Sequence, residues 1–149
     1  MTTKSAYQPE GYQSVIPYLH VNGAAKLITF MKEVFDAKEI AVYPRPDGTV
    51  GHAALRIGDS MIELADAGPD WPAMPSALQV YVPDADAAYH RALKAGAKSL
   101  VEPATQFYGD RTASVRDSSG NNWYIATQIE VVSREEVDKR LAAMSQSKV

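Results

Sequence analysis

The amino-acid sequence predicts an α+β fold made of two tandem βαβββ modules that form a curved, cup-shaped mixed sheet. Three observations predict it. The order strand, helix, three strands occurs twice, a proline-rich stretch separates the two copies, and 46% hydrophobic residues in a chain of 149 suffice for one globular core. We place module one at about 14–66, module two at about 76–128 and a C-terminal helix at about 133–144, within a single domain spanning 1–149.

Module one begins with a strand over Ser14–Val21, where polar and apolar residues alternate. A helix over Ala24–Phe35 follows, because Leu27, Ile28, Met31, Val34 and Phe35 recur at spacings of three and four. Three strands come next, in EIAVYPR, TVGHAALRIG and SMIELAD, separated by Pro46-Asp47-Gly48 and Gly58-Asp59. Such Asp-Gly and Gly-Asp pairs are typical of tight turns between antiparallel strands.

Module two repeats this order after the connector AGPDWPAMP, whose three prolines exclude a central strand. Its elements are the strand SALQVYV, a helix from Asp84 to Gly96, and the strands SLVEP, RTASVRD and NNWYIATQ. Trp71 in the connector is either a lid or partner contact, or a buried aromatic that anchors the loop. Ser133 and Glu136 have the spacing of a capping box and start the last helix, whose apolar stripe we expect to pack on the domain.

Charge and composition exclude several classes of protein. With 18 acidic and 15 basic residues the net charge is −3, which gives no electrostatic basis for binding nucleic acid. The chain has no cysteine, which excludes disulfides and thiolate metal sites and fits a reducing, cytoplasmic location. No run of about twenty apolar residues predicts a membrane span, and 1–13 has no apolar segment typical of an export signal.

Four stretches resemble one known family, and together they cover about Val15 to Gln128. They are VIPYLHVNGAAKLITFMKEVF, GHAALRIGDSMIEL, VPDADAAYHRALKAGA and YGDRTASVRDSSGNNW, of which the last is the most specific. The chain resembles the vicinal-oxygen-chelate superfamily, which includes glyoxalases, bleomycin-resistance proteins and extradiol dioxygenases, and in particular its PhnB-like branch. The resemblance implies a glyoxalase-like fold whose sheet encloses a ligand or a metal ion.

The resemblance also implies where a metal would be held, and this chain departs from that pattern. Metal-dependent members place His or Glu on the first strand and Glu on the last strand of each module. The corresponding positions here are Ile16, Ala77 and Tyr124, and Glu63 is the only family ligand position that keeps a carboxylate. One carboxylate does not satisfy a divalent ion. We therefore predict no metal site and no cofactor, while a divalent metal bound by a different ligand set stays open.

Strand alternation identifies the side chains that face the predicted cup. His52 and Glu63 share a face across the Gly58-Asp59 turn, so they are the candidate catalytic pair for proton transfer, because an imidazole beside a carboxylate suits a general base. The predicted ligand pocket adds Tyr18, His20, Gln79, Tyr81, Asn122, Tyr124 and Arg111. Each has a plainer interpretation: a hydrogen-bonded His52, amphipathic core tyrosines, and an ion pair between Arg111 and a nearby carboxylate.

These observations leave three functions open. The first is a protein that binds a small organic ligand without chemistry, as bleomycin-resistance relatives do. The second is a glyoxalase-type lyase or isomerase that uses His52 and Glu63, with or without a divalent metal. The third is a domain that associates with another protein. Because the family often completes the cup between two chains, and because sheet edges would otherwise stay unpaired, we also expect a homodimer.

Overall fold

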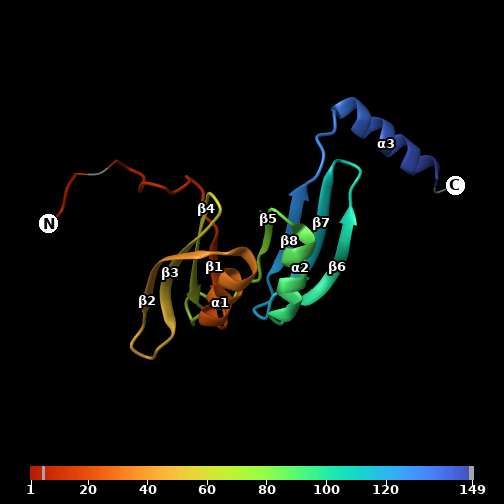
Figure 1. Ribbon diagram of the computed structural model, residues 1–149. Coiled ribbons are helices and arrows are strands. Elements are labelled where there is room, and N and C mark those ends of the chain that lie inside the picture. Colours follow the sequence, from red (N-terminus) through yellow and green to blue (C-terminus); the bar gives the residue numbers. More distant parts are fainter. Residues whose placement is uncertain (5, 148–149) are drawn as a thin grey trace. The chain divides into compact units, whose positions relative to one another are not determined.

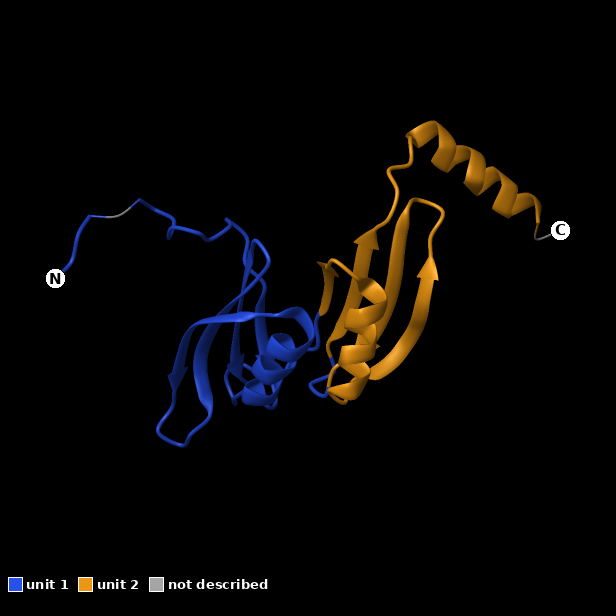
Figure 2. Cartoon of the chain, in the orientation of Figure 1, with its two compact units in different colours: residues 1–76, 118–120 blue, residues 77–117, 121–149 orange. Residues whose placement is uncertain are grey.

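The computed structural model describes residues 1–4 and 6–147 and divides the chain into two compact units (Figures 1 and 2). Unit 1 comprises 1–76 and 118–120, and unit 2 comprises 77–117 and 121–149. Each unit holds one βαβββ module with its own four-stranded mixed sheet, and unit 2 also holds the C-terminal helix, so the predicted α+β class with two βαβββ modules is confirmed. Among the described residues, none of the helices combines the length and apolar character that crossing a membrane requires.

Unit 1 contains, in chain order, β1 (Tyr18–Val21), α1 (Ala24–Phe35), β2 (Lys38–Pro44), β3 (Val50–Ile57) and β4 (Ser60–Asp66). The sheet order is β1-β4-β3-β2, with β1 parallel to β4 and the other pairs antiparallel. Helix α1 has the predicted bounds. Its apolar stripe is buried, and it packs on β3 and β4.

The core of unit 1 lies between α1 and one face of the sheet. Leu19 and Val21 of β1 and Leu64 of β4 are each no more than 2% exposed. Since side chains alternate along a strand, Tyr18, His20 and Glu63 point to the opposite face. The apolar positions of β1 and β4 therefore determine which polar side chains are left for a site.

Unit 2 repeats this arrangement with β5 (Ala77–Tyr81), α2 (Ala85–Lys94), β6 (Lys98–Thr105), β7 (Asp110–Arg116) and β8 (Asn122–Gln128) in the order β5-β8-β7-β6. Trp123 on β8 is 2% exposed, and its indole donates to Asp117 at 2.8 Å. Asp117 also accepts from the backbone and side-chain amides of Asn121, so a fully hydrogen-bonded polar cluster closes the β7–β8 turn.

Helix α3 (Arg134–Gln146) follows β8. Ser133 caps it by accepting from the Glu136 N–H, as the capping-box spacing predicts. The expectation that its apolar stripe packs on the domain is wrong, because no residue of α3 is buried and Leu141 and Met144 are 41% and 47% exposed. What holds α3 is polar: Arg140 donates to the Phe107 carbonyl at 3.0 Å.

Candidate functional site

The candidate site lies in unit 1, on the sheet face that α1 does not cover. Strand β1 supplies Tyr18 and His20, which pair in register with Glu63 and Ala65 of the parallel strand β4. Ala54 on β3 lies directly opposite Glu63. The two alanines are buried and small, so the larger side chains on this face have room to extend across the sheet.

Glu63, His52 and Tyr18 form a continuous row over three strands. His52 Nε2 lies 3.9 Å from Glu63 Oε1, and His52 Nδ1 lies 3.1 Å from the Tyr18 hydroxyl oxygen. Tyr43, the β2 neighbour of His52, stacks on the imidazole with ring centroids 6.1 Å apart. The structure thus brings together the two side chains predicted for proton transfer and adds Tyr18 as the third member. Their catalytic role stays a prediction.

Burial raises the pKa of Tyr18 above its ordinary value of 10.0, and the negative charge of Glu63 raises it further, whereas Arg45 acts in the opposite direction. The phenol is therefore neutral at neutral pH. It serves there as a hydrogen-bond donor and acceptor and not as a phenolate.

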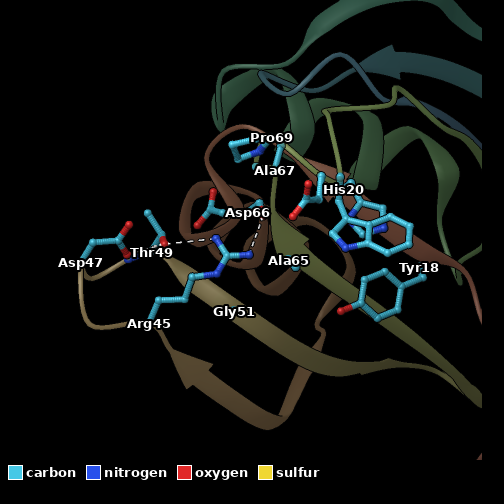
Figure 3. Close-up of a pocket in the computed structure, with 13 residues that line it drawn as sticks. Tyr18, His20, Arg45, Asp47, Thr49, Gly51, Ala65, Asp66, Ala67 and Pro69 are labelled. Carbon is cyan, nitrogen blue, oxygen red and sulfur yellow. Dashed lines mark hydrogen bonds between the residues drawn. The ribbon is translucent and has the colours of Figure 1, made fainter.

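A pocket of about 830 Å³ opens beside this row. Figure 3 shows Tyr18 and His20 of β1 on one side of it and Arg45, from the turn after β2, on the other. Gly51, Asp66 and Trp71 also line the pocket. Its size is within the range of about 300–1,000 Å³ that is typical of sites for small organic ligands.

Trp71 forms an exposed edge of this pocket and is 68% accessible to solvent. Its indole stacks nearly parallel on His20, with centroids 5.6 Å apart and 11° between the planes, and Tyr18 lies 5.1 Å from His20 on the ring-centroid measure. The loop closes on itself through reciprocal backbone hydrogen bonds between Gly68 and Trp71. The interpretation of Trp71 as a buried anchor is therefore wrong, and it is an exposed aromatic at the pocket edge.

Asp66 has mainly a structural role in the pocket wall. Its Oδ1 accepts from the backbone N–H groups of Gly23 and Ala24 at 3.1 and 2.9 Å, and its Oδ2 accepts from Val50 N–H at 2.8 Å. The cap residue of α1 is Gly23, which has a left-handed φ of 84° and no side chain to cap the helix. A strand residue therefore supplies the negative charge that the helix N-terminus favours.

Arg45 is held in the wall by two contacts. Its guanidinium donates to the Asp66 carbonyl at 3.0 Å and to the Thr49 hydroxyl at 3.3 Å (Figure 3). Asp47 in the same turn accepts from Thr49, and this hydrogen bond lowers the pKa of its carboxyl. The pocket wall therefore combines one guanidinium with two carboxylates, those of Asp47 and Asp66, that already accept hydrogen bonds.

In unit 2 the predicted residues Gln79, Tyr81, Asn122 and Tyr124 share the corresponding face of the sheet. Gln79 pairs in register with Tyr124, and Ala77 with Asn122. The Tyr81 hydroxyl donates to Asp110 at 2.8 Å, and this hydrogen bond raises the pKa of the phenol. Asn122 accepts from Arg116 at 2.9 Å. The predicted pocket residues on this face are amides and phenols, two of which already bond to Asp110 and Arg116, whereas the row in unit 1 contains an imidazole and a carboxylate.

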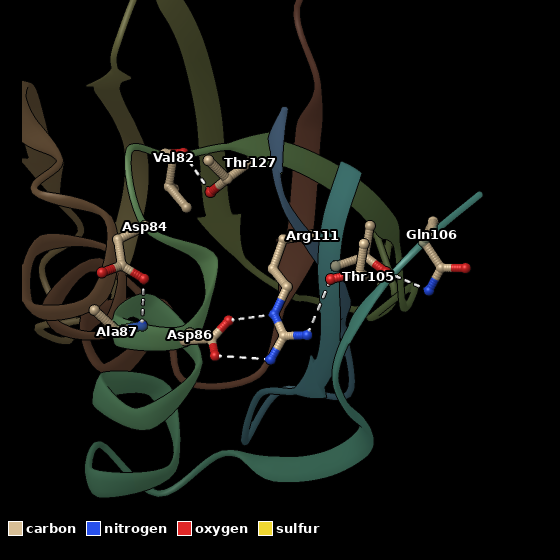
Figure 4. Close-up of polar contacts among 9 residues, drawn as sticks. Val82, Asp84, Asp86, Ala87, Thr105, Gln106, Arg111 and Thr127 are labelled. Carbon is tan, nitrogen blue, oxygen red and sulfur yellow. Dashed lines mark hydrogen bonds and ion pairs between the residues drawn. The ribbon is translucent and has the colours of Figure 1, made fainter. Parts of the chain in front are cut away.

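Arg111 does not join these four residues. It lies on the other face of β7, where its guanidinium donates through Nε and Nη2 to both carboxylate oxygens of Asp86 on α2, at 2.9 and 3.0 Å (Figure 4). A further bond reaches Thr105 at 3.2 Å. The plainer interpretation of Arg111, an ion pair with a nearby carboxylate, is confirmed. This pair lowers the pKa of Asp86.

The donor set does not fit a divalent metal. Ile16 and Ala77 have no ligating side chain, and Glu63 has His52 as its ionisable neighbour. Within 1–4 and 6–147, no three side chains of His, Asp or Glu come close enough together to hold one metal ion. One carboxylate and one imidazole fall short of the several oxygen or nitrogen ligands that such ions need.

Strand alternation alone did not identify Arg45, Asp66 and Trp71 as pocket residues. Arg45 and Trp71 lie in a turn and a connector, where alternation carries no information. The sequence did hold a signal for Asp66. Gly23 precedes the helix and has no side chain to accept from the first helical N–H groups, so a residue distant in the sequence has to accept from them.

Comparison with known proteins gives the family. The family model described as "Glyoxalase/Bleomycin resistance protein/Dioxygenase superfamily" matches residues 15–125. An uncharacterized protein of Mycobacterium bovis is 36% identical over 143 residues, covering 87% of this chain and 90% of that protein. An uncharacterized protein of Mycobacterium tuberculosis has the same identity and covers 87% and 81%.

Solved structures show the same fold. TioX from Micromonospora sp. ML1 is similar with a TM-score of 0.67 at 21% identity, covering 78% of this chain and 98% of that one. The protein PA1353 from Pseudomonas aeruginosa is similar with a TM-score of 0.64 at 19% identity, covering 78% and 98%. With the matched family model and the duplicated module, these findings establish that the chain belongs to the glyoxalase/bleomycin resistance protein/dioxygenase superfamily and has a glyoxalase-like fold.

Proposed function

We propose that this chain is a small-molecule-binding protein of the PhnB-like branch, and that it holds a flat organic ligand in the pocket of unit 1. The observation that carries the proposal is the aromatic edge of a pocket of about 830 Å³, where Trp71 stacks on His20 beside Tyr18. Exposed aromatic faces next to a concave space favour stacking of a ring-bearing ligand.

His20 supports the same proposal. Its Nδ1 is shielded from solvent and has no hydrogen-bond partner among the described residues. A buried polar atom without a partner costs free energy. A ligand that inserts beside Trp71 and offers a hydrogen-bonding group to this nitrogen would recover that cost.

The charges of the wall indicate the class of ligand. Asp47, Asp66 and Asp70 outnumber Arg45, which already donates to its neighbours. The excess of carboxylates among these lining residues would repel an anion. We therefore propose a neutral or positively charged aromatic ligand.

Calorimetric titration with naphthol, naphthyltrimethylammonium and naphthalenesulfonate tests the proposal, because these probes share a ring and differ in charge. We expect the first two to bind more tightly than the sulfonate. Trp71→Ala should weaken binding about tenfold, since a stacked aromatic pair contributes roughly 0.5–1.5 kcal/mol beyond area burial. Met74→Ala, in the same loop and 63% exposed, is the matched control. Equal losses in both variants, or tightest binding of the sulfonate, would contradict the proposal.

A second candidate function is a lyase or isomerase that moves a proton next to a carbonyl, supported by the 3.9 Å approach of His52 to Glu63. Deuterium exchange into tetralone, a flat ketone with such protons, can be followed by proton NMR. Exchange above the buffer rate that disappears in His52→Ala and Glu63→Gln, with folding preserved, would support an enzyme. Exchange at the buffer rate would leave the binding protein as the proposal.

A further inference from the structure

Ligand specificity in this pocket can be inferred from the row formed by Tyr18, His52 and Glu63. We propose that the Tyr18 hydroxyl, oriented by His52 and Glu63, presents a hydrogen-bond acceptor to the pocket, so that it selects ligands carrying a hydroxyl or N–H donor. The inference rests on the proposed function and assigns Tyr18 as the specificity-determining residue, with His52 and Glu63 as positioning residues.

Glu63 determines which nitrogen of His52 carries the proton. An ionised carboxylate only accepts hydrogen bonds, and His52 Nε2 lies 3.9 Å from Glu63 Oε1. This negative charge favours the tautomer with the proton on Nε2, which leaves a lone pair on Nδ1. The Tyr18 hydroxyl at 3.1 Å then has to be the donor to Nδ1.

The Tyr18 hydroxyl can form further hydrogen bonds on the side that does not face His52. Tyr18 lines the pocket, and once its proton points to His52 only oxygen lone pairs remain for a ligand. The raised pKa of Tyr18, caused first by burial and then by Glu63, keeps the proton on the phenol. A ligand hydroxyl or N–H is therefore satisfied at this point, whereas a ligand ether or carbonyl oxygen is not.

Protonation of His52 reverses the direction of the hydrogen bond between Tyr18 and His52. The groups that face the imidazole are the Tyr18 hydroxyl from β1, the Tyr43 ring from β2 and the Glu63 carboxylate from β4, while Arg45 acts on Tyr18. When Nδ1 takes up one proton from solvent it becomes a donor to the Tyr18 oxygen. The phenol proton then turns to the pocket, so the preference for donor-bearing ligands falls at acidic pH.

Naphthol and methoxynaphthalene are suitable probes, because they share a ring and only naphthol carries a donor. We expect the wild-type chain to bind naphthol about fivefold more tightly near pH 8, the advantage of one net hydrogen bond. At acidic pH, once His52 is protonated, the ratio of the two dissociation constants should approach one. Calorimetric titration at both pH values measures the ratio.

Two matched tyrosine variants separate specificity from structure. Both Tyr18 and Tyr43 lie against His52, but only the Tyr18 hydroxyl contacts it in the way the proposal requires. Tyr18→Phe should bring the ratio to about one at both pH values, and Tyr43→Phe should keep the wild-type ratio and its pH dependence. His52→Phe should remove the pH dependence while circular dichroism shows an unchanged fold.

The outcomes distinguish this inference from the function on which it rests. If neither probe binds the wild-type chain, both the proposed function and the inference are overturned. If both probes bind with a ratio that does not change with pH, or if Tyr18→Phe and Tyr43→Phe change it equally, the inference alone is overturned.

Discussion

Replacing Asp66 with asparagine should destabilise the chain more than any other single change of a pocket carboxylate. The carboxylate accepts three backbone N–H groups, from Gly23 and Ala24 at the start of α1 and from Val50 at the start of β3. The single side-chain oxygen of asparagine can accept either from the two helix N–H groups or from the Val50 N–H. The NH₂ group of asparagine then faces the N–H donors that are left without an acceptor. The change also removes a negative charge from a helix N-terminus.

The magnitude follows from these losses. A charge-assisted hydrogen bond contributes roughly 1.5–3 kcal/mol and the helix-dipole interaction roughly 0.3–1 kcal/mol, so Asp66→Asn should lower the free energy of unfolding by about 2–4 kcal/mol. Urea denaturation followed by circular dichroism measures it, with an unchanged m-value as the sign that only stability has changed. The control is Asp70→Asn, an exposed carboxylate in the same pocket lining. A difference below about 0.5 kcal/mol between the two variants would refute the capping role of Asp66.

Three other predictions are independent of Asp66. Arg111 lowers the pKa of Asp86 below its ordinary value of 3.8. The wild type should therefore be more stable than Asp86→Asn above that pH, and this difference in stability should vanish as the pH falls through the lowered pKa. Thermal denaturation across acidic pH measures the difference, and a difference that does not change with pH would contradict the prediction. A Cβ at Gly109, where φ is +104°, would collide with the Glu130 carbonyl, whereas Gly58 at φ +57° has open space around it. In urea denaturation Gly109→Ala should therefore cost at least about 1 kcal/mol more than Gly58→Ala, and equal costs would oppose this. The homodimer is expected to appear in static light scattering at micromolar concentration, and a monomer mass would exclude it.

The sequence predicted the fold well because its strongest signals are local. The recurrence of Leu27, Met31 and Val34 at helical spacing defines α1, whose bounds agree with the prediction. The Gly58-Asp59 turn sets the register in which Ala54 faces Glu63. Both patterns span a few residues, so no knowledge of distant contacts was needed.

The candidate site was predictable only where strands build it. Alternation placed Tyr18, His20, His52 and Glu63 on one face, and the structure brings them together. Arg111 was assigned to the pocket from its place in the stretch Tyr108–Arg111 and not from alternation, and its register with Thr127 puts it on the other face of β7, where it meets Asp86 of α2. Such a contact depends on which helix covers which strand, and no local pattern encodes it.

The two modules share one fold but cap their helices with different residues. Aligned on their helix caps, Gly23 corresponds to Asp84, which caps α2 with its own side chain by accepting from Ala87 N–H at 3.0 Å (Figure 4). Module one lacks this local cap and recruits Asp66. The position of Asp66 is taken in module two by Thr127, which donates instead to the Val82 carbonyl at 2.7 Å.

The inner faces differ in the same alignment, and this difference identifies the module in which chemistry or selective binding is to be sought. The Tyr18–Glu63 pair of unit 1 corresponds to the Gln79–Tyr124 pair of unit 2, so a carboxylate in one copy is a phenol in the other. Only the first pair has an imidazole beside it, that of His52, which approaches both the Tyr18 hydroxyl and the Glu63 carboxylate. Substitutions in the Tyr18 row of unit 1 should therefore change a pH-dependent ligand preference. Gln79→Ala, which changes the residue of unit 2 that corresponds to Tyr18, should leave that preference unchanged.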